Sequence, residues 1–278
     1  LIDPQFASAW TNKGDALTGL GRFEEAVSAY DEALAINPQL GLTLFDKGVA
    51  YSFMGRYEEA VEAYNESLQI NPDFAEAWYN MGTSLTSLGR IEEAITSYDR
   101  ALAINPDLAE AWSNKGMSLG ALGRYDEAVA ALDNATQISP DLVEAWYNKG
   151  KALYAQEKYE EAISALDQAI ALEPEFARAY VYKGTALARE GRQEEALAAY
   201  DEAIRINPEY EAAWFNKALT LGDMGRTEDS LLALNETLAI NPQNADAWGQ
   251  KSINLQALGR EQEAEEALAA AKELGYTG

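Results

Sequence analysis

Apolar and small residues recur every three or four positions along the chain, which is the period of an amphipathic helix. One such run begins at Phe74 and continues through Trp78, Met81 and Leu85. A second run follows a Gly-Arg pair and ends before Pro106, because proline has no backbone N–H to donate within a helix. The pattern predicts two helices of roughly 13 residues joined by a tight turn.

This pair of runs recurs at a fixed interval of 34 residues. All eight prolines keep that interval, and every tryptophan lies six residues after one of them. The tryptophans are Trp10, Trp78, Trp112, Trp146, Trp214 and Trp248, with Leu44 and Tyr180 in the two remaining places. The chain therefore consists of eight copies of one helical hairpin, and each hairpin needs its neighbours to bury its tryptophan face.

Glycines mark two further places in each copy. Gly82 and its equivalents lie four residues after the tryptophan position, where a small residue lets two helices approach closely. Gly89 and its equivalents end the first helix, since glycine readily adopts the left-handed conformation found at helix ends. The fifth copy departs from this rule, with Glu157 and Lys158 in place of the Gly-Arg turn.

The order Trp10, Gly14, Ala26, Tyr30 and Pro38 resembles the tetratricopeptide repeat, and the resemblance covers essentially the whole chain. It implies an all-α fold, a right-handed superhelical α-solenoid of eight helix-turn-helix units forming a single domain over 1–278. The expected repeats span about 7–40, 41–74, 75–108, 109–142, 143–176, 177–210, 211–244 and 245–278. Residues 1–6 are expected to be the remnant of a preceding repeat.

One departure from the family is systematic. The family usually has leucine three residues after the tryptophan, whereas seven copies here have lysine, as at Lys115. We expect the lysine methylenes to cover the tryptophan while the ammonium reaches water or a carboxylate. A role in ligand binding is the alternative.

Composition excludes several kinds of chemistry. The chain has no cysteine and no histidine, which rules out disulfides, thiol nucleophiles and histidine bases. With 21 Lys and Arg against 46 Asp and Glu, the net charge of −25 disfavours nucleic-acid binding. No apolar run is long enough to span a membrane. We expect a non-catalytic, cytoplasmic protein without cofactor or metal.

The resemblance implies that the first helix of each unit forms a concave wall. Two residues after the tryptophan position, asparagine recurs on this wall, and the members of this asparagine column are Asn12, Asn80, Asn114, Asn148 and Asn216. Because an amide offers both a donor and an acceptor, it can pair with a peptide unit whatever the side chain. The column predicts binding of an extended peptide, unless these residues only solvate the wall.

Aromatic residues lie one position after the tryptophan, at Tyr79, Tyr147 and Phe215 among others. Exposed aromatics on such a wall are candidate anchors for a partner. Packing between neighbouring first helices is the alternative.

Charge on the wall is uneven. Lys151, Arg178 and Arg189 form a basic spot beside Tyr182, whereas the first half of the wall is acidic. We expect this spot to accept an acidic side chain or a C-terminal carboxylate. It only partly resembles the carboxylate clamp of chaperone-binding family members, because Ser113 and Met117 stand where a lysine and an asparagine are needed.

Three functions are consistent with these features. The first is a scaffold or adaptor that binds an extended peptide or a helix in the concave groove. The second is a structural spacer that self-associates end to end, for which the last helix offers Ala264, Ala267, Leu268 and Ala271. The third is the substrate-recruiting region of a larger enzyme.

Overall fold

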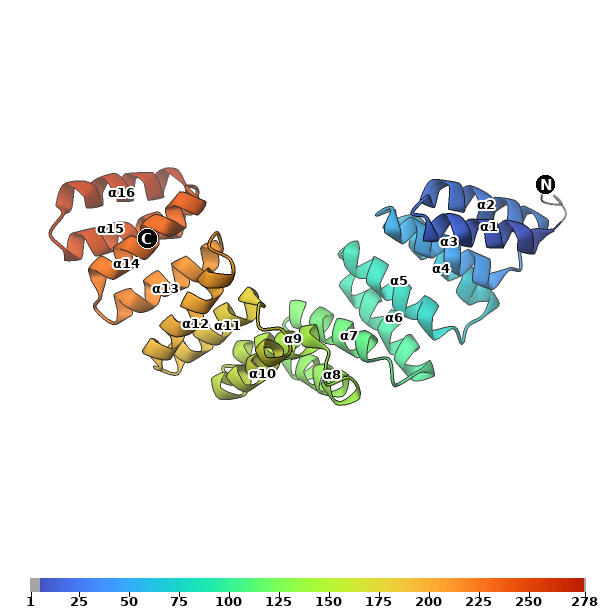
Figure 1. Cartoon of the computed structure of the whole chain (residues 1–278), viewed down its shortest axis with the longest axis horizontal. Coiled ribbons are helices and arrows are strands. Elements are labelled where there is room, and N and C mark those ends of the chain that lie inside the picture. The colour runs from blue at the N-terminus through green and yellow to red at the C-terminus, as the bar shows by residue number, and fades with distance from the viewer. Residues whose placement is uncertain (1–5, 278) are drawn as a thin grey trace. The chain divides into compact units, whose positions relative to one another are not determined.

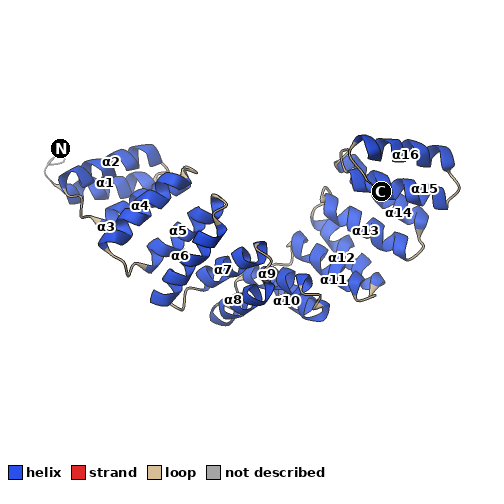
Figure 2. Ribbon diagram, turned by 180° about the vertical axis from the view of Figure 1, so that it is seen from behind, coloured by secondary structure: helices blue, strands red, loops and turns tan. Residues whose placement is uncertain are grey.

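The computed structural model describes residues 6–277, and within that range it contains sixteen helices, short connections and no strand (Figure 2). Each predicted repeat contains one pair of helices. The helices are α1 Ala7–Gly19, α2 Phe23–Ile36, α3 Gly41–Phe53, α4 Tyr57–Ile70, α5 Ala75–Ser87, α6 Ile91–Ile104, α7 Ala109–Ala121, α8 Tyr125–Ile138, α9 Val143–Ala155, α10 Tyr159–Leu172, α11 Ala177–Arg189, α12 Gln193–Ile206, α13 Glu211–Asp223, α14 Thr227–Ile240, α15 Ala245–Ala257 and α16 Glu261–Glu273. The predicted remnant at 1–6 lies outside the described residues except for Phe6.

Each pair of helices forms a hairpin, and inside each of two compact units the hairpins stack in sequence order (Figure 1). The chain divides into two compact units, an N-terminal unit that ends at Leu142 and a C-terminal unit that begins at Val143. Inside each unit, the second helix of one hairpin packs against the first helix of the next. This arrangement confirms the predicted all-α solenoid.

On six of the eight first helices a glycine makes room for a large side chain of the second helix, whereas α13 and α15 have Ala218 and Ser252 at this position. A Cβ added at Gly82 would lie 2.6 Å from Cε1 of Tyr98, whose side chain is fully buried. A Cβ at Gly116 would lie 2.5 Å from Cγ of Leu132 and 3.1 Å from the Ala128 carbonyl oxygen. The predicted close approach of the two helices is therefore confirmed. The space left by the glycine is filled by a tyrosine or a leucine of the second helix.

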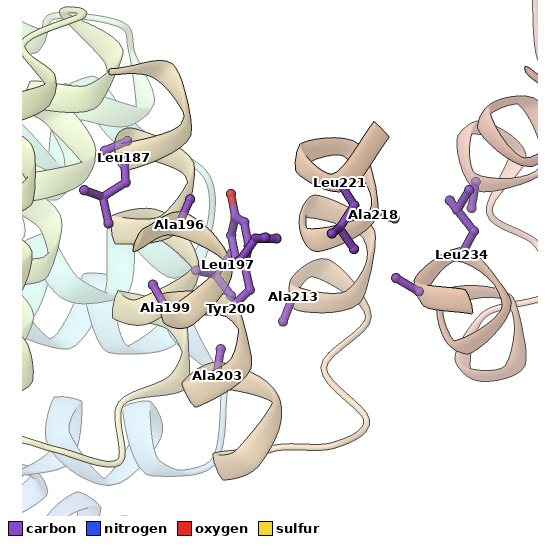
Figure 3. Close-up of a cluster of buried hydrophobic side chains, with 14 of the residues drawn as sticks. Leu187, Ala196, Leu197, Ala199, Tyr200, Ala203, Ala213, Ala218, Leu221 and Leu234 are labelled. Carbon is purple, nitrogen blue, oxygen red and sulfur yellow. The ribbon is translucent and has the colours of Figure 1, made fainter. Parts of the chain in front are cut away.

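Alanines complete the interior around these large residues. In the C-terminal unit, Ala196 and Ala203 are fully buried on α12 beside Tyr200 (Figure 3). Ala213 and Ala218 are fully buried on the neighbouring helix α13, and all five residues belong to one hydrophobic cluster.

A hydrogen bond explains why tryptophan follows proline by six residues. The indole N–H of Trp78 donates to the carbonyl oxygen of Pro72 at 2.9 Å, and Trp112 donates to Pro106 in the same way. In these repeats, and in those of Trp214 and Trp248, the bond ties the start of the first helix to the connection before it. Tyr180 and Leu44 lack an indole N–H, so their repeats cannot form it.

The lysine column behaves as expected from its position. Lys115 Nζ lies 2.6 Å from Oδ1 of Asp99 and 5.2 Å from the centroid of the Trp112 ring. The same lysine–aspartate pair recurs at Lys47, Lys183 and Lys217. These contacts confirm that the lysines cover and pair rather than stand free for a ligand.

The turns between paired helices share one backbone conformation. Gly89 has φ of 73°, and the glycines at the equivalent turns have similar values. Glu157 adopts φ of 60° in the fifth repeat, where it is the one non-glycine residue with positive φ within residues 6–277. A glutamate is strained there because its Cβ approaches the following carbonyl oxygen.

The last hairpin hides the alanines that suggested end-to-end stacking. Ala264, Ala267 and Ala271 are at most 2% exposed. The ring of Tyr276 covers Gly249 on α15, since a Cβ there would lie 2.4 Å from the tyrosine Cζ. Leu268, the fourth residue of that prediction, is half-buried, and the exposed neighbours Glu265 and Glu266 make this side of α16 largely acidic.

Candidate functional site

The first helix of each hairpin has one accessible stripe. On α5 the residues Ala77, Met81 and Leu85 are buried, whereas Glu76 and Thr83 are exposed. We call the accessible stripes of the first helices the first-helix face. The asparagine column and the basic spot predicted from the sequence both lie on it.

The asparagine column is accessible in both units. Asn12 is exposed, and the other four members are half-buried. In the N-terminal unit Asn114 Nδ2 donates to the hydroxyl of Tyr79 at 3.3 Å. In the C-terminal unit the side chains of Asn148 and Asn216 form no hydrogen bond with any residue between 6 and 277.

The aromatic residues next to the column mostly pack rather than protrude. Tyr147 is only 5% exposed, so the prediction of an exposed anchor is wrong for this ring. Tyr79 is half-buried, and burial raises the pKa of its phenol. Phe215 is half-buried against the hydrophobic cluster of the C-terminal unit. These rings support neighbouring first helices and present at most an edge to a partner.

A group of tyrosines and cations occupies the first-helix face of α9 and α11. We call it the tyrosine–cation cluster, and it consists of Tyr147, Lys151, Tyr154, Arg178, Tyr182 and Arg189. The ring of Tyr182 meets those of Tyr147 and Tyr154 edge-on, with centroids 5.6 and 6.3 Å away. Edge-to-face contacts of this kind are a favourable arrangement of aromatic rings.

Two of the predicted basic residues lie over the same ring. Lys151 Nζ is 5.3 Å from the centroid of Tyr147 and 5.6 Å from that of Tyr182. The guanidinium carbon of Arg178 is 5.2 Å from the Tyr147 centroid. The structure therefore brings Lys151, Arg178 and Tyr182 together around Tyr147, as the sequence predicted for a local basic spot.

Arg189 reaches the cluster through Tyr154. The interaction with the nearby Tyr154 hydroxyl raises the pKa of the Arg189 guanidinium. Tyr154 and the buried Tyr147 were not among the residues expected to contact these cations. A tyrosine in a column otherwise occupied by Thr, Ser, Gly, Ala and Gln was the available signal for Tyr154.

One carboxylate is paired within the cluster. Glu144 Oε1 lies 2.9 Å from a terminal nitrogen of Arg178. Burial raises the pKa of the Tyr147 and Tyr182 phenols, so both rings stay neutral. The cluster consequently carries more positive than negative charge.

The equivalent face of the N-terminal unit has the opposite character. Asp46 replaces asparagine in the column on α3, and Asp15 projects from the neighbouring α1. Burial and then the charge of Asp15 raise the pKa of Asp46 to about 6. The hydroxyl of Tyr30 donates to Oδ1 of Asp15 at 3.0 Å.

The described residues contain neither a cluster of metal ligands nor a membrane-spanning helix. No group of three or more acidic side chains between residues 6 and 277 is placed to hold a metal ion. No helix in that part of the chain is both long and apolar enough to cross a membrane.

Solved structures with the same architecture are numerous. YrrB, whose structure is described as that of a TPR protein with an unusual peptide-binding site, is 27% identical over 63% of this chain and 90% of its own, with a TM-score of 0.57. The C-terminal part of a repeat protein from Cytophaga hutchinsonii is 17% identical over 86% of this chain and 98% of its own, with a TM-score of 0.71. A tetratricopeptide repeat protein from Parabacteroides merdae is 16% identical over 96% of this chain and 98% of its own, with a TM-score of 0.66.

Sequence comparison gives the family. None of the curated proteins matches the chain. Models described as tetratricopeptide repeat match residues 5–73, 75–108, 97–130, 147–211 and 211–244, and one described as TPR repeat matches residues 118–157. Together with the stacked helical hairpins, these matches show that the chain belongs to the tetratricopeptide repeat family.

Proposed function

We propose that this chain is a non-catalytic scaffold or adaptor whose first-helix face binds an extended peptide of a partner protein. The observation that carries the proposal is the asparagine column. Asn148 and Asn216 are half-buried on the C-terminal unit, and neither side chain is used in a hydrogen bond to the described residues.

The chemistry of these amides suits a peptide backbone. Each asparagine can donate to a carbonyl oxygen and accept from an N–H, which are the two groups that every peptide unit except that of proline offers. One such hydrogen bond contributes only about 0.5–1.5 kcal/mol, so several must act together. A repeated column supplies them at successive places on one face.

The similarity to YrrB supports the same function. That protein is described as having a peptide-binding site, and its sequence is 27% identical to this chain over the matched region. The net charge of −25 favours proteins over nucleic acids as partners, because it repels phosphate backbones.

The proposal is tested by screening the whole chain against a library of random dodecapeptides. Two double variants remove the amides separately, Asn80→Ala with Asn114→Ala in the N-terminal unit and Asn148→Ala with Asn216→Ala in the C-terminal unit. We expect at least one double variant to lose the peptides that the wild type retains, with roughly tenfold weaker binding per pair of hydrogen bonds.

The matched control is Asn65→Ala. Asn65 is exposed on the second helix α4, away from the first-helix face, so its removal should leave peptide binding unchanged. Retention of every peptide by both double variants would refute binding through the column. A wild type that retains no peptide would refute the function itself.

A further inference from the structure

Cations on this protein are usually neutralised by a nearby carboxylate. The turn arginines pair with a glutamate three residues later, as Arg192 does with Glu195 at 2.7 Å. The column lysines of several repeats pair with an aspartate, as Lys183 does with Asp167 at 2.6 Å, whereas Lys251 donates to Asn235. In a chain with an excess of acidic residues, such pairing is the expected state of a basic side chain.

The tyrosine–cation cluster departs from this rule. Lys151 contacts the faces of Tyr147 and Tyr182 and forms no ion pair with a carboxylate of the described residues. Arg189 lies beside the hydroxyl of Tyr154, and the interaction between them raises the pKa of the arginine. Of the three cations, Arg178 alone forms an ion pair with a carboxylate of the described residues, that of Glu144. A guanidinium has five N–H donors, so Arg178 keeps donors for a second anion while it is paired with Glu144.

Packing holds the cations in place. The Tyr147 ring is 5% exposed, and the rings of Tyr182, Tyr154 and Phe176 contact one another or Tyr147 at centroid distances between 4.9 and 6.3 Å. Lys151 and Arg178 lie over this packed base rather than extending freely into solvent. A cation held in one position loses less conformational entropy when it binds an anion.

We propose that the tyrosine–cation cluster is the subsite for an anionic residue of the bound peptide. This inference rests on the proposed function and specifies the ligand, an extended segment with a carboxylate or a phosphorylated hydroxyl placed over α9 and α11. Lys151 and Arg178 supply charge-assisted hydrogen bonds, and Arg189 adds positive potential from the end of α11.

The balance of charge at the cluster favours an anion. Glu144 pairs with Arg178. The pKa of Arg189 is raised first by Tyr154 and to a smaller extent by the charge of Asp223. Tyr147 and Tyr182 contribute no negative charge, because burial raises the pKa of both phenols. Three cations therefore face two carboxylates, and a guest anion restores neutrality in a partly buried place where its attraction is screened less than in water.

The test uses the whole chain and four peptide libraries that differ only at a central fixed residue. That residue is glutamate, phosphoserine, glutamine or lysine, and the flanking positions are random. We expect the wild type to bind the glutamate or phosphoserine library about tenfold more tightly than the glutamine library. Stronger retention of phosphoserine identifies a phosphate ligand, and stronger retention of glutamate identifies a carboxylate.

The variant Lys151→Gln with Arg178→Gln should bind all four libraries with the affinity that the wild type has for the glutamine library. The control Lys158→Gln with Lys272→Gln removes the same charge from two exposed residues outside the cluster and should keep the acidic preference. Thermal unfolding of each variant establishes that it folds. A salt series on the wild type needs no variant, and the acidic preference should decline as ionic strength rises.

Failure of this inference differs from failure of the proposed function. An acidic preference that is absent from the wild type, or that survives in Lys151→Gln with Arg178→Gln, would overturn the subsite while peptide binding through the asparagines stands. Absence of retention from all four libraries would overturn both.

Discussion

The N-terminal and C-terminal units share an interior but differ on the first-helix face. In both units a glycine of the first helix accommodates a large residue of the second, as Gly82 does for Tyr98 and Gly184 does for Tyr200, each with a Cβ-to-ring distance of 2.6 Å. At the same column of the face, the N-terminal unit has Asp46 and the C-terminal unit has Tyr182.

The difference separates two kinds of constraint. Interior positions must satisfy close packing in every copy, so the same residue types recur at each of them. Positions on the first-helix face need only avoid interfering with folding, so they are free to differ according to what they bind. The acidic N-terminal face and the tyrosine–cation cluster are the clearest expression of that freedom.

The largest expected effect tests whether the two interiors are equivalent. Gly116→Ala and Gly150→Ala should each lower the free energy of unfolding by about 1–3 kcal/mol, because the new Cβ overlaps a buried leucine. The Cβ would lie 2.5 Å from Leu132 in the first case and 2.6 Å from Leu166 in the second. Urea denaturation of both variants measures the two costs.

The control for this pair is Gly120→Ala, one helical turn from Gly116. A Cβ at Gly120 meets nothing within 4 Å, so alanine should stabilise the helix by about 0.5–1 kcal/mol. Equal effects of Gly116→Ala and Gly120→Ala would show that helix propensity, and not packing, governs the glycine column.

Most of the fold follows from the sequence because its cause is local and repeated. Proline spacing, helical periodicity and turn glycines each fix one feature of every hairpin, and the lysine–aspartate pairs follow from the lysine position. The face was harder to predict. Tyr147 looks like an exposed anchor by its column, but its burial depends on Phe176, Tyr182 and the next first helix, which lie 29–35 positions further along the chain.

The turn of the fifth repeat provides a second asymmetry between the units. All four turns of the N-terminal unit have glycine with positive φ, whereas Glu157 adopts φ of 60° in the C-terminal unit. Glu157→Gly should raise the free energy of unfolding by about 1 kcal/mol, because glycine has no Cβ to strain in this conformation. The reciprocal change Gly123→Glu should lower it by a similar amount.

Thermal or urea unfolding of both turn variants provides the measurement. Changes of opposite sign and similar size in the free energy of unfolding would show that the two turns differ in stability because of backbone conformation alone. A Glu157→Gly variant that is less stable than the wild type would mean that the glutamate side chain contributes more than its strain costs.

A smaller effect is expected at Asp46 and depends on pH. Its pKa of about 6 in the folded protein lies above the value of about 3.9 in an unfolded chain. Between these values the folded state retains a proton that the unfolded state has lost, so the stability contributed by Asp46 falls as pH rises from 4 to 6. Partial exposure of the carboxylate reduces the effect to about 1 kcal/mol or less.

Asp46→Asn removes this dependence and restores the column residue. The variant should be more stable than the wild type at pH 7.5, and the difference should shrink at pH 4.5, where Asp46 is protonated. Comparing melting temperatures of the two proteins at each pH cancels the titration of every other carboxylate. A stability difference that is the same at both values would contradict the raised pKa.

Binding of a peptide to the asparagine column is measured most directly by the side-chain amide resonances of the asparagines in a ¹⁵N-labelled chain. A saturating amount of a peptide selected from the random library should shift the amide signals of Asn148 and Asn216 and leave that of Asn65 on α4 unchanged. Shifts at Asn65 with unmoved signals at Asn148 and Asn216 would place the peptide elsewhere and contradict binding on the first-helix face.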